Sequence, residues 1–310
     1  MTSSEVTDTH LFERLVQKIQ PGNTLLRAWE LKGGISAQVT ALEIKQLDAT
    51  TKKLVVRQHG AIDFNENPQI AADEFRLLNI IHSAGLPAPI PYLVDASGKI
   101  FETPCLVIEF VEGETEFTPT DLDDYLRQFA ICLSQIHTID AVKYDLGFLP
   151  DVGQLTTAKI SNRPAQVDDS LGEGRIRDIL EQVFPLEQRN PSVLLHGDFW
   201  VGNLLWRDGQ LAGVIDWEDA KRGDPLADLA NSRLEILWAF GIEAMQQFTA
   251  QYQTIMTTLD YTPLPYWELC AALRPMFRIG EWAGNAVKEK VMRERHAWFV
   301  EQAIKRLNIS

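Results

Sequence analysis

The 310-residue sequence has few cysteines, few basic residues and no long apolar run. Its three cysteines, Cys105, Cys132 and Cys270, lie far apart among apolar neighbours, which predicts buried free thiols and argues against a disulfide framework. Lys and Arg number 29 against 43 Asp and Glu, and the net charge of −14 argues against a nucleic-acid partner, because such binding relies on basic side chains that neutralise phosphates. The acidic balance suits either a cationic substrate or solubility alone.

The sequence also lacks the features of a membrane or exported protein. No apolar stretch approaches the ~20 residues that span a bilayer, and residues 1–10 have neither the basic start nor the apolar stretch of a signal peptide. We therefore expect a cytoplasmic protein without a membrane partner, as a monomer or a homodimer.

Length and composition predict two lobes. Hydrophobic residues make up 45% of the chain and charged residues 23%, as in ordinary globular proteins, so the whole chain should fold. A chain of 310 residues is longer than most single hydrophobic cores require. Strand-like patterns give way to helical ones near residue 112, which predicts an amino-terminal lobe over 1–111 and a carboxy-terminal lobe over 112–310.

The amino-terminal lobe has the pattern of an antiparallel sheet with helices. Apolar residues at helical spacing predict an entry helix over 10–20 and a second helix over 70–82. Branched residues between turn formers predict five strands, over 25–31, 37–44, 53–57, 92–95 and 106–110.

The carboxy-terminal lobe has mostly helical patterns. They predict helices over 122–139 and 174–184, and four more that begin near residues 227, 242, 266 and 284. Between 140 and 171 the periodicity is weak and turn formers are frequent, so no helix is predicted there.

The most informative stretch is 192–217, SVLLHGDFWVGNLLWRDGQLAGVIDW. An apolar strand at 193–195 leads into a loop with Asp198 and Asn203, and a hairpin then ends at Asp216. Phosphoryl transfer from ATP needs an acidic group beside the attacking hydroxyl and hard oxygen ligands for magnesium. Each residue alone is an ordinary loop former, but together the three have the right chemistry for these tasks.

The segments HGDFWVGN and VIDWE resemble the signature of the aminoglycoside phosphotransferase and choline kinase-like family, small-molecule relatives of protein kinases. The resemblance covers about residues 23–300. It implies an α+β, protein-kinase-like fold with a five-stranded antiparallel sheet plus helix in the first lobe and a mostly helical second lobe. It also implies that ATP and Mg²⁺ are cofactors, with Asp198 as catalytic base and Asn203 and Asp216 as magnesium ligands.

The same resemblance implies a nucleotide site in the first lobe. Gly33, Gly34 and Ser36 lie where family members have a phosphate-covering loop, although a Gly-Gly pair between strands also forms a simple hairpin turn. Glu109 and Val111 lie at the link between the lobes, where backbone groups of the family bind adenine.

Arg57 is a departure from the protein-kinase pattern, which places a lysine at this point of the third strand. Arginine keeps the positive charge and can bind phosphate as a fork, but it is bulkier than lysine. Glu74 on the following helix is its expected partner. The neighbouring Asp73 should point elsewhere, since successive helical residues are rotated by ~100°.

Two residues near the central motif have expected structural roles. His196 should anchor the catalytic loop through hydrogen bonds, rather than act as a base or metal ligand. Asp228, in the segment GDPLADL, either has a purely structural role or braces that loop.

The acceptor is expected to be a small molecule. Only seven residues separate Asp216 from Asp224, which leaves no room for the activation segment that positions a peptide in protein kinases. Amino alcohols, sugars and aminoglycosides all remain open as acceptors, and four tryptophans of this lobe could form an aromatic box for an amine or belong to the core: Trp238, Trp267, Trp282 and Trp298. The alternative function is a nucleotide-binding pseudokinase that acts as a scaffold or sensor.

Overall fold

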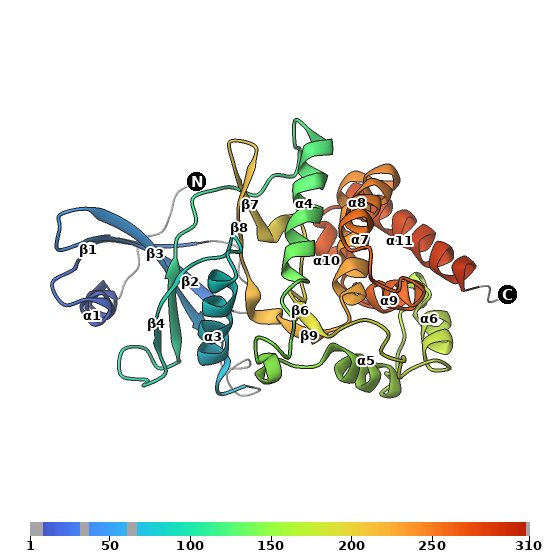
Figure 1. The fold of residues 1–310 in the computed structure, drawn as a ribbon, viewed down its shortest axis with the longest axis horizontal. Coiled ribbons are helices and arrows are strands. Elements are labelled where there is room, and N and C mark those ends of the chain that lie inside the picture. Colours follow the sequence, from blue (N-terminus) through green and yellow to red (C-terminus); the bar gives the residue numbers. More distant parts are fainter. Residues whose placement is uncertain (1–8, 32–36, 61–66, 308–310) are drawn as a thin grey trace. The chain divides into compact units, whose positions relative to one another are not determined.

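The computed structural model describes residues 9–31, 37–60 and 67–307 (Figure 1). The chain divides into two compact units. The first unit comprises Met1–Gly113 and the short segment Ala212–Glu218, and the second comprises Glu114–Leu211 and Asp219–Ser310. The chain therefore leaves the first unit, returns to it for seven residues, and leaves it again.

A five-stranded antiparallel sheet forms the centre of the first unit. The strands are β1 (Thr24–Glu30), β2 (Ala37–Lys45), β3 (Thr51–His59), β4 (Pro91–Asp95) and β5 (Cys105–Glu109), in the spatial order β1-β2-β3-β5-β4. All neighbouring strands pair antiparallel. The predicted five-stranded sheet is confirmed.

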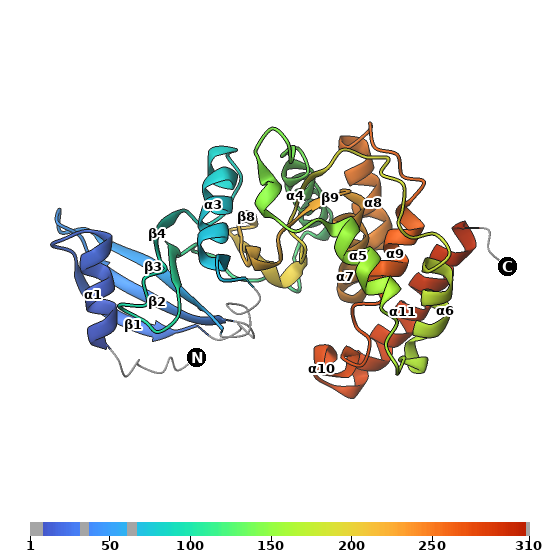
Figure 2. The same cartoon turned by 90° about the horizontal axis from the view of Figure 1, so that it is seen from below.

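Two helices pack against this sheet, α1 (Thr9–Ile19) and α3 (Ile70–Ser83), one on each side of the strands in Figure 2. Successive side chains of a strand point to opposite faces. Leu54 and Val56 of β3 accordingly join Phe12 of α1 in one buried cluster, whereas Arg57 points the other way, to Glu74 of α3. The α3 face of the sheet thus holds a buried ion pair among apolar residues, and the α1 face holds an apolar cluster.

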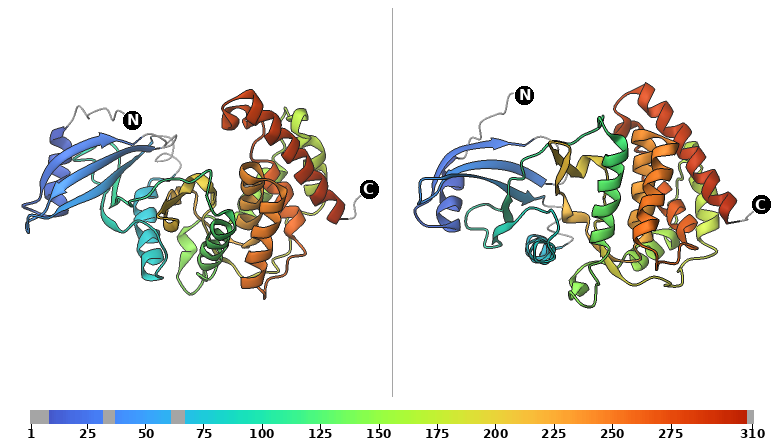
Figure 3. Two further views of the ribbon diagram at one scale, coloured as in Figure 1. Left: turned by 90° about the horizontal axis from the view of Figure 1, so that it is seen from above. Right: turned by 45° about the horizontal axis from the view of Figure 1, so that its top comes forward.

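The second unit is mostly helical. Its helices are α4 (Leu122–Ile136), α5 (Val152–Ser161), α6 (Glu173–Leu180), α7 (Leu226–Phe240), α8 (Ile242–Ile255), α9 (Leu264–Ala272), α10 (Ile279–Ala283) and α11 (Ala286–Arg306). Helix α4 packs against α8, and α7 packs against both α8 and α9. Helix α11 packs against α9 and α7, so that the green, orange and red helices lie side by side in Figure 3.

Four short strands accompany these helices. Strand β6 (Val193–Leu195) pairs antiparallel with β9 (Lys221–Gly223), and β7 (Leu204–Arg207) forms a two-stranded sheet with β8 (Gln210–Val214). The β6–β9 pair fixes both ends of the segment that contains the candidate catalytic loop.

The sequence pattern missed or misplaced several helices. Helix α5 lies within 140–171, where none was predicted, because its only fully buried residue is Ile160 and no apolar stripe results. The short α10 was also missed. Helix α4 ends at Ile136 rather than 139, because the N–H groups of Thr138 and Ile139 bond to carbonyls three residues back and tighten the backbone. Helix α6 ends at Leu180 rather than 184.

Two simpler predictions concern the cysteines and the membrane. All three cysteines are free thiols, as predicted; Cys105 and Cys132 are buried, and Cys270 is partly so. Among the helices of the described residues, none has the length and apolar character needed to cross a bilayer.

Phe129 of α4 is a sharp test of the second unit's core. Its side chain is 0% exposed and makes edge-to-face contacts with Phe199 and Phe248 at centroid distances of 4.8 and 5.4 Å. We expect Phe129→Ala to lower the free energy of unfolding by about 3–5 kcal/mol in urea denaturation, because it leaves a cavity. The control Val142→Ala, at a residue 87% exposed, should change it by less than ~0.5 kcal/mol, and equal losses would contradict this packing.

Candidate active site

A buried carboxylate of α7 holds the loop that follows β6. Asp228 is 2% exposed, and its two oxygens accept hydrogen bonds from the backbone N–H groups of His196 (2.6 Å) and Gly197 (3.0 Å). Burial alone would raise the pKa of Asp228, but the bond and charge of His137, together with His196, outweigh burial and lower it. Of the two roles considered for Asp228, the structure therefore shows the bracing one.

Gly197 is required by the backbone of this loop. Its φ is +81°, a conformation that L side chains rarely adopt, and an added Cβ would lie 2.0 Å from the carbonyl oxygen of Asp219. No larger residue fits here without moving the loop. This explains why a glycine stands where protein kinases carry an arginine.

Asp198 and Asn203 are brought together within the loop. The Nδ2 atom of Asn203 donates to the backbone carbonyl of Asp198 at 2.9 Å and to its Oδ2 at 3.2 Å, which leaves Oδ1 of Asn203 as the atom for a cation. The backbone N–H of Asp198 donates to Nδ1 of His196 at 3.3 Å. His196 thus anchors the loop through hydrogen bonds, as expected.

Arg274 is a site residue that the sequence pattern did not reveal. It follows α9, and its guanidinium donates to Oδ1 of Asp198 at 2.5 Å and to the carbonyl oxygen of Gly197 at 2.8 Å. Arg274 lies 76 residues after Asp198 in the sequence, and it is not part of a recognisable local motif. Only the packing of α9 in the second unit places it there.

Within the first unit, Arg57 is the centre of an ion cluster. Its side chain is 8% exposed and lies 3.0 Å from Glu74, 2.6 Å from Glu218 and 3.2 Å from Asp216. Asp73 is not part of the cluster and accepts a hydrogen bond from Asn67 instead. The expected pairing of Arg57 with Glu74 is present, and two carboxylates that follow β8 join it.

Opposing effects set the pKa values in this cluster. Burial acts to lower the pKa of Arg57, but the charges of Glu74, Asp216 and Glu218 outweigh it, and the pKa is raised. Burial likewise acts to raise the pKa of Glu74, yet the charge of Arg57 and the nearby His59 bring it below its ordinary value. Both partners are therefore held in their charged forms.

Asp216 has an unusual backbone. Its φ of +67° lies in the left-handed region, which Asp tolerates better than most side chains but which remains uncommon. The indole N–H of Trp217 donates to the carbonyl of Val214 at 2.9 Å, and the N–H of Val214 donates to the carbonyl of Pro87 at 2.7 Å. These bonds hold the left-handed turn, as is common for strained residues at functional sites.

Glu109 and Val111, the predicted adenine-binding residues, both lie in the first unit. The N–H of Glu109 donates to the carbonyl of Ile90 at 2.8 Å, so only the carbonyl of Glu109 could accept from adenine. The side chain of Val111 lies against Gly213. Gly33, Gly34 and Ser36 lie outside the described residues.

The two expected magnesium ligands, Asn203 and Asp216, do not belong to a larger cluster of metal-binding side chains in the described residues. Over 9–31, 37–60 and 67–307, no group of three or more His, Cys, Asp or Glu side chains is placed to hold a metal ion. Magnesium on ATP fits this pattern, since it is bound through one or two protein oxygens plus phosphates. Asn203 lies in the second unit and Asp216 in the first.

Comparison with known proteins gives the family. A model of the phosphotransferase enzyme family matches residues 30–264, which include β6, the loop with Asp198 and the turn with Asp216. The chain belongs to this family.

Solved structures with the same fold include aminoglycoside phosphotransferases. One from Ralstonia eutropha, described as putative, aligns with a TM-score of 0.67 at 17% identity over 96% of this chain and 98% of its own. A complex of the aminoglycoside phosphotransferase APH(4)-Ia with ADP and hygromycin B aligns with a TM-score of 0.62 at 18% identity, over 95% and 98%. The predicted α+β, kinase-like fold is confirmed.

Curated relatives are more varied. Acyl-CoA dehydrogenase family member 10 of mouse is 26% identical over 59% of this chain, which spans 18% of that longer protein. Homoserine kinase of Phenylobacterium zucineum is 24% identical over 69% of this chain and 71% of its own length. Hygromycin-B 4-O-kinase of Escherichia coli is 24% identical, over 56% and 54%.

Glu235, on α7, is a further carboxyl group near Asp198. Burial, the main cause, raises its pKa from 4.5 to about 7; Asp198 adds to the rise, while Arg274 and Lys288 oppose it. A carboxyl whose pKa is raised in the folded state favours folding while protonated. The contribution is complete below about pH 4.5 and is lost as the pH rises through 7.

Substitution of Glu235 tests this shift. Because solvent screens this partly exposed side chain, we expect Glu235→Gln to gain about 1–2 kcal/mol of unfolding free energy over the wild type between pH 5 and pH 8. Urea denaturation of both proteins at the two pH values measures this. A difference between variant and wild type that does not change with pH would show that Glu235 titrates normally.

Proposed function

We propose that this protein transfers the γ-phosphate of ATP to a hydroxyl group of a small molecule, with Asp198 as the catalytic base. The observation that supports it most is the arrangement around Asp198. Its loop is fixed by Asp228, and its carboxylate is oriented by Asn203 on one oxygen and Arg274 on the other. Preorganised groups of this kind supply most of the catalysis in phosphoryl transfer.

In the proposed reaction, the acceptor hydroxyl donates a hydrogen bond to the carboxylate of Asp198. Each carboxylate oxygen has two lone pairs, so the bonds from Arg274 and Asn203 leave capacity for the proton. As the hydroxyl oxygen bonds to the γ-phosphorus, the bond from that phosphorus to the bridging oxygen breaks and ADP leaves. The hydroxyl proton moves to Asp198.

Magnesium fits the hard oxygen atoms that the chain offers. Oδ1 of Asn203 and the carboxylate of Asp216 would hold it, and when bound it would neutralise the charge on the phosphates. Arg57 would bind phosphate in place of the usual lysine and be held in turn by Glu74, while Glu109 and Val111 would bind adenine through their backbone. Gly33, Gly34 and Ser36 would cover the phosphates.

Substitution of Asp198 tests its role as base. Asp198→Ala should lower kcat by at least ~100-fold, the scale of a positioned acid–base group, while binding of the nucleotide persists. We would measure ATP consumption with magnesium against amino alcohols, sugars, hydroxy acids and aminoglycosides. The exposed Asp123→Ala, also in the second unit, should retain full activity. Unchanged turnover in Asp198→Ala would refute the assignment.

Substitution of Asp216 tests the metal. Asp216→Asn keeps the size of the side chain but removes the charge, so the magnesium concentration for half-maximal activity should rise by at least about tenfold. A titration of activity with magnesium measures this, again with Asp123→Ala as control. An unchanged requirement would exclude Asp216 as a ligand.

The pseudokinase remains the alternative function. The observation in its favour is that Arg57, rather than lysine, pairs with Asp216. Nucleotide binding by calorimetry, without turnover of any acceptor, would favour it over the kinase.

A further inference from the structure

A cavity of about 290 Å³ lies in the second unit, beside the candidate base. Its wall includes Gly197 and Arg274, and both contact Asp198 directly: one precedes it in the chain and the other is ion-paired with it. The volume is at the lower end of the ~300–1,000 Å³ typical of ligand sites. An acceptor in this cavity would therefore be small and would have one end at Asp198.

The cations that line this cavity differ in whether they are paired with a carboxylate. Lys221 is paired with Asp219, through the backbone carbonyl at 2.7 Å and the carboxylate at 3.4 Å, and Arg274 is paired with Asp198. The carboxylate of Asp228 is used by the loop N–H groups. Lys159 is the remaining cation of the wall, and its ammonium has no hydrogen bond or ion pair within the described part of the chain.

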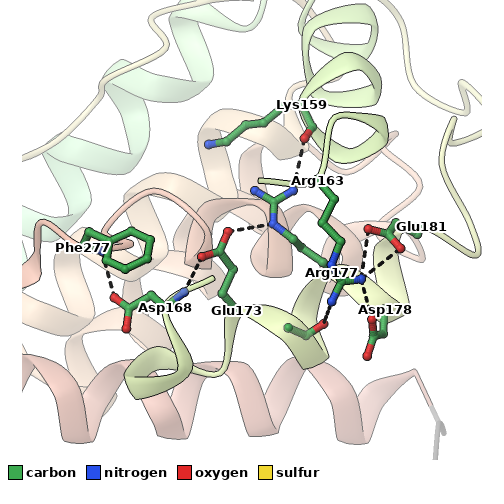
Figure 4. A network of polar contacts seen from close by, with 9 residues as sticks. Lys159, Arg163, Asp168, Glu173, Arg177, Asp178, Glu181 and Phe277 are labelled. Carbon is green, nitrogen blue, oxygen red and sulfur yellow. Dashed lines mark hydrogen bonds and ion pairs between the residues drawn. The ribbon is translucent and has the colours of Figure 1, made fainter. Parts of the chain in front are cut away.

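A buried network holds the backbone of Lys159 in place (Figure 4). Arg177 donates to the carbonyl of Lys159 at 3.2 Å and to Glu173 at 2.7 Å, and Glu173 accepts from the N–H of Asp168 at 2.8 Å. Asp168 in turn accepts from the N–H of Phe277, in the segment that carries Arg274. One network thus holds the backbone of Lys159 and the segment that carries Arg274. Figure 4 shows the Lys159 side chain extending away from this network.

Two arginines lie close enough to Lys159 to affect its charge. Although the side chain is exposed, desolvation by nearby protein lowers the pKa of its ammonium, and the charges of Arg274 and Arg177 lower it further, while Cys270 and Glu173 oppose the change. A bound anion would offset this repulsion, because an opposite charge stabilises the ammonium form.

Asn231 is a second, independent indication of a ligand. It lines the same cavity from α7 and is 3% exposed, yet neither Nδ2 nor Oδ1 has a hydrogen-bond partner within the ranges the structure describes. Leaving buried polar atoms unpaired costs about 1–3 kcal/mol. A ligand that both accepts and donates hydrogen bonds would remove this cost.

We propose that the acceptor is a small hydroxylated anion, whose hydroxyl group lies at Asp198 and whose carboxylate or phosphate group binds Lys159 and Asn231 in this cavity. The inference rests on the proposed function and names its substrate class. Leu155, Ile160 and Leu273 supply apolar wall for the carbon chain between the two groups. Trp267 also lines this cavity and packs edge-to-face against Phe184, while Trp238 packs edge-to-face on Trp282.

Matched acceptors test the proposal. Hydroxy acids of increasing chain length would be compared with the diol, the amino alcohol and the phosphate monoester of each length, by magnesium-dependent ATP consumption. We expect the highest kcat/KM for an anionic member, and the carboxylate and phosphate arms identify which anion is preferred. Preference for the diol or the amino alcohol would overturn the inference and leave the proposed kinase function intact.

Lys159→Met keeps the length of the side chain and removes its charge. It should raise KM for the preferred anion by about 10- to 100-fold, the worth of a charged hydrogen bond, while kcat and the KM for the matched diol change little. Asn231→Leu should raise the same KM by roughly 5- to 10-fold. The control Lys305→Met alters an exposed lysine of α11 and should leave this KM unchanged. If Lys159→Met also left the KM for the anion unchanged, the anion site would be refuted.

Direct binding separates this inference from the kinase proposal. If no acceptor of any class stimulated ATP consumption, the proposed function would fail. Calorimetry of the same hydroxy acids and phosphate monoesters on the wild type and Lys159→Met would still judge the cavity. Binding that is lost in the variant supports the anion site, and absence of binding in the wild type overturns it.

Discussion

The active-site loop depends on the buried carboxylate of Asp228. Its two oxygens accept from consecutive backbone N–H groups, and these bonds place Gly197 and Asp198 at the end of β6. Removal of this carboxylate would leave the buried N–H of His196 unpaired, at a cost of about 1–3 kcal/mol, and would release the partly buried N–H of Gly197 as well. Asn203 and Arg274 can orient the carboxylate of Asp198 only because the backbone of Asp198 is held in this way. A long-range bond from α7 therefore supports the whole arrangement.

The sequence predicted the parts of the fold that have strong local signals. The five strands and the amphipathic α4 were found because buried side chains recur at the strand or helix period. Helix α5 was missed because it buries little and has no apolar stripe. The pairing of Arg57 with Glu74 could be anticipated from β3 and α3, whereas Arg274 could not, because its contact with Asp198 is made by tertiary packing alone.

The two ion clusters differ in what they leave for a ligand. Around Arg57, three carboxylates surround one guanidinium, so a phosphate would have to compete with residues of the chain. Around the cavity of the second unit, Lys221 and Arg274 are each paired with a carboxylate, and Lys159 has no ion pair within the described residues. The net charge of −14 therefore says little about the acceptor, since local charge rather than the total acts on a ligand at this distance.

The return of the chain to the first unit has a consequence for biosynthesis. Residues 212–218 belong to that unit, and they supply Asp216 and Glu218 to the buried Arg57. While the ribosome has made only the first 113 residues, Arg57 has just one of its three carboxylates. Domains usually fold in order from the amino terminus as they emerge. Here the ion cluster of the first unit cannot be completed until about a hundred residues of the second have been made.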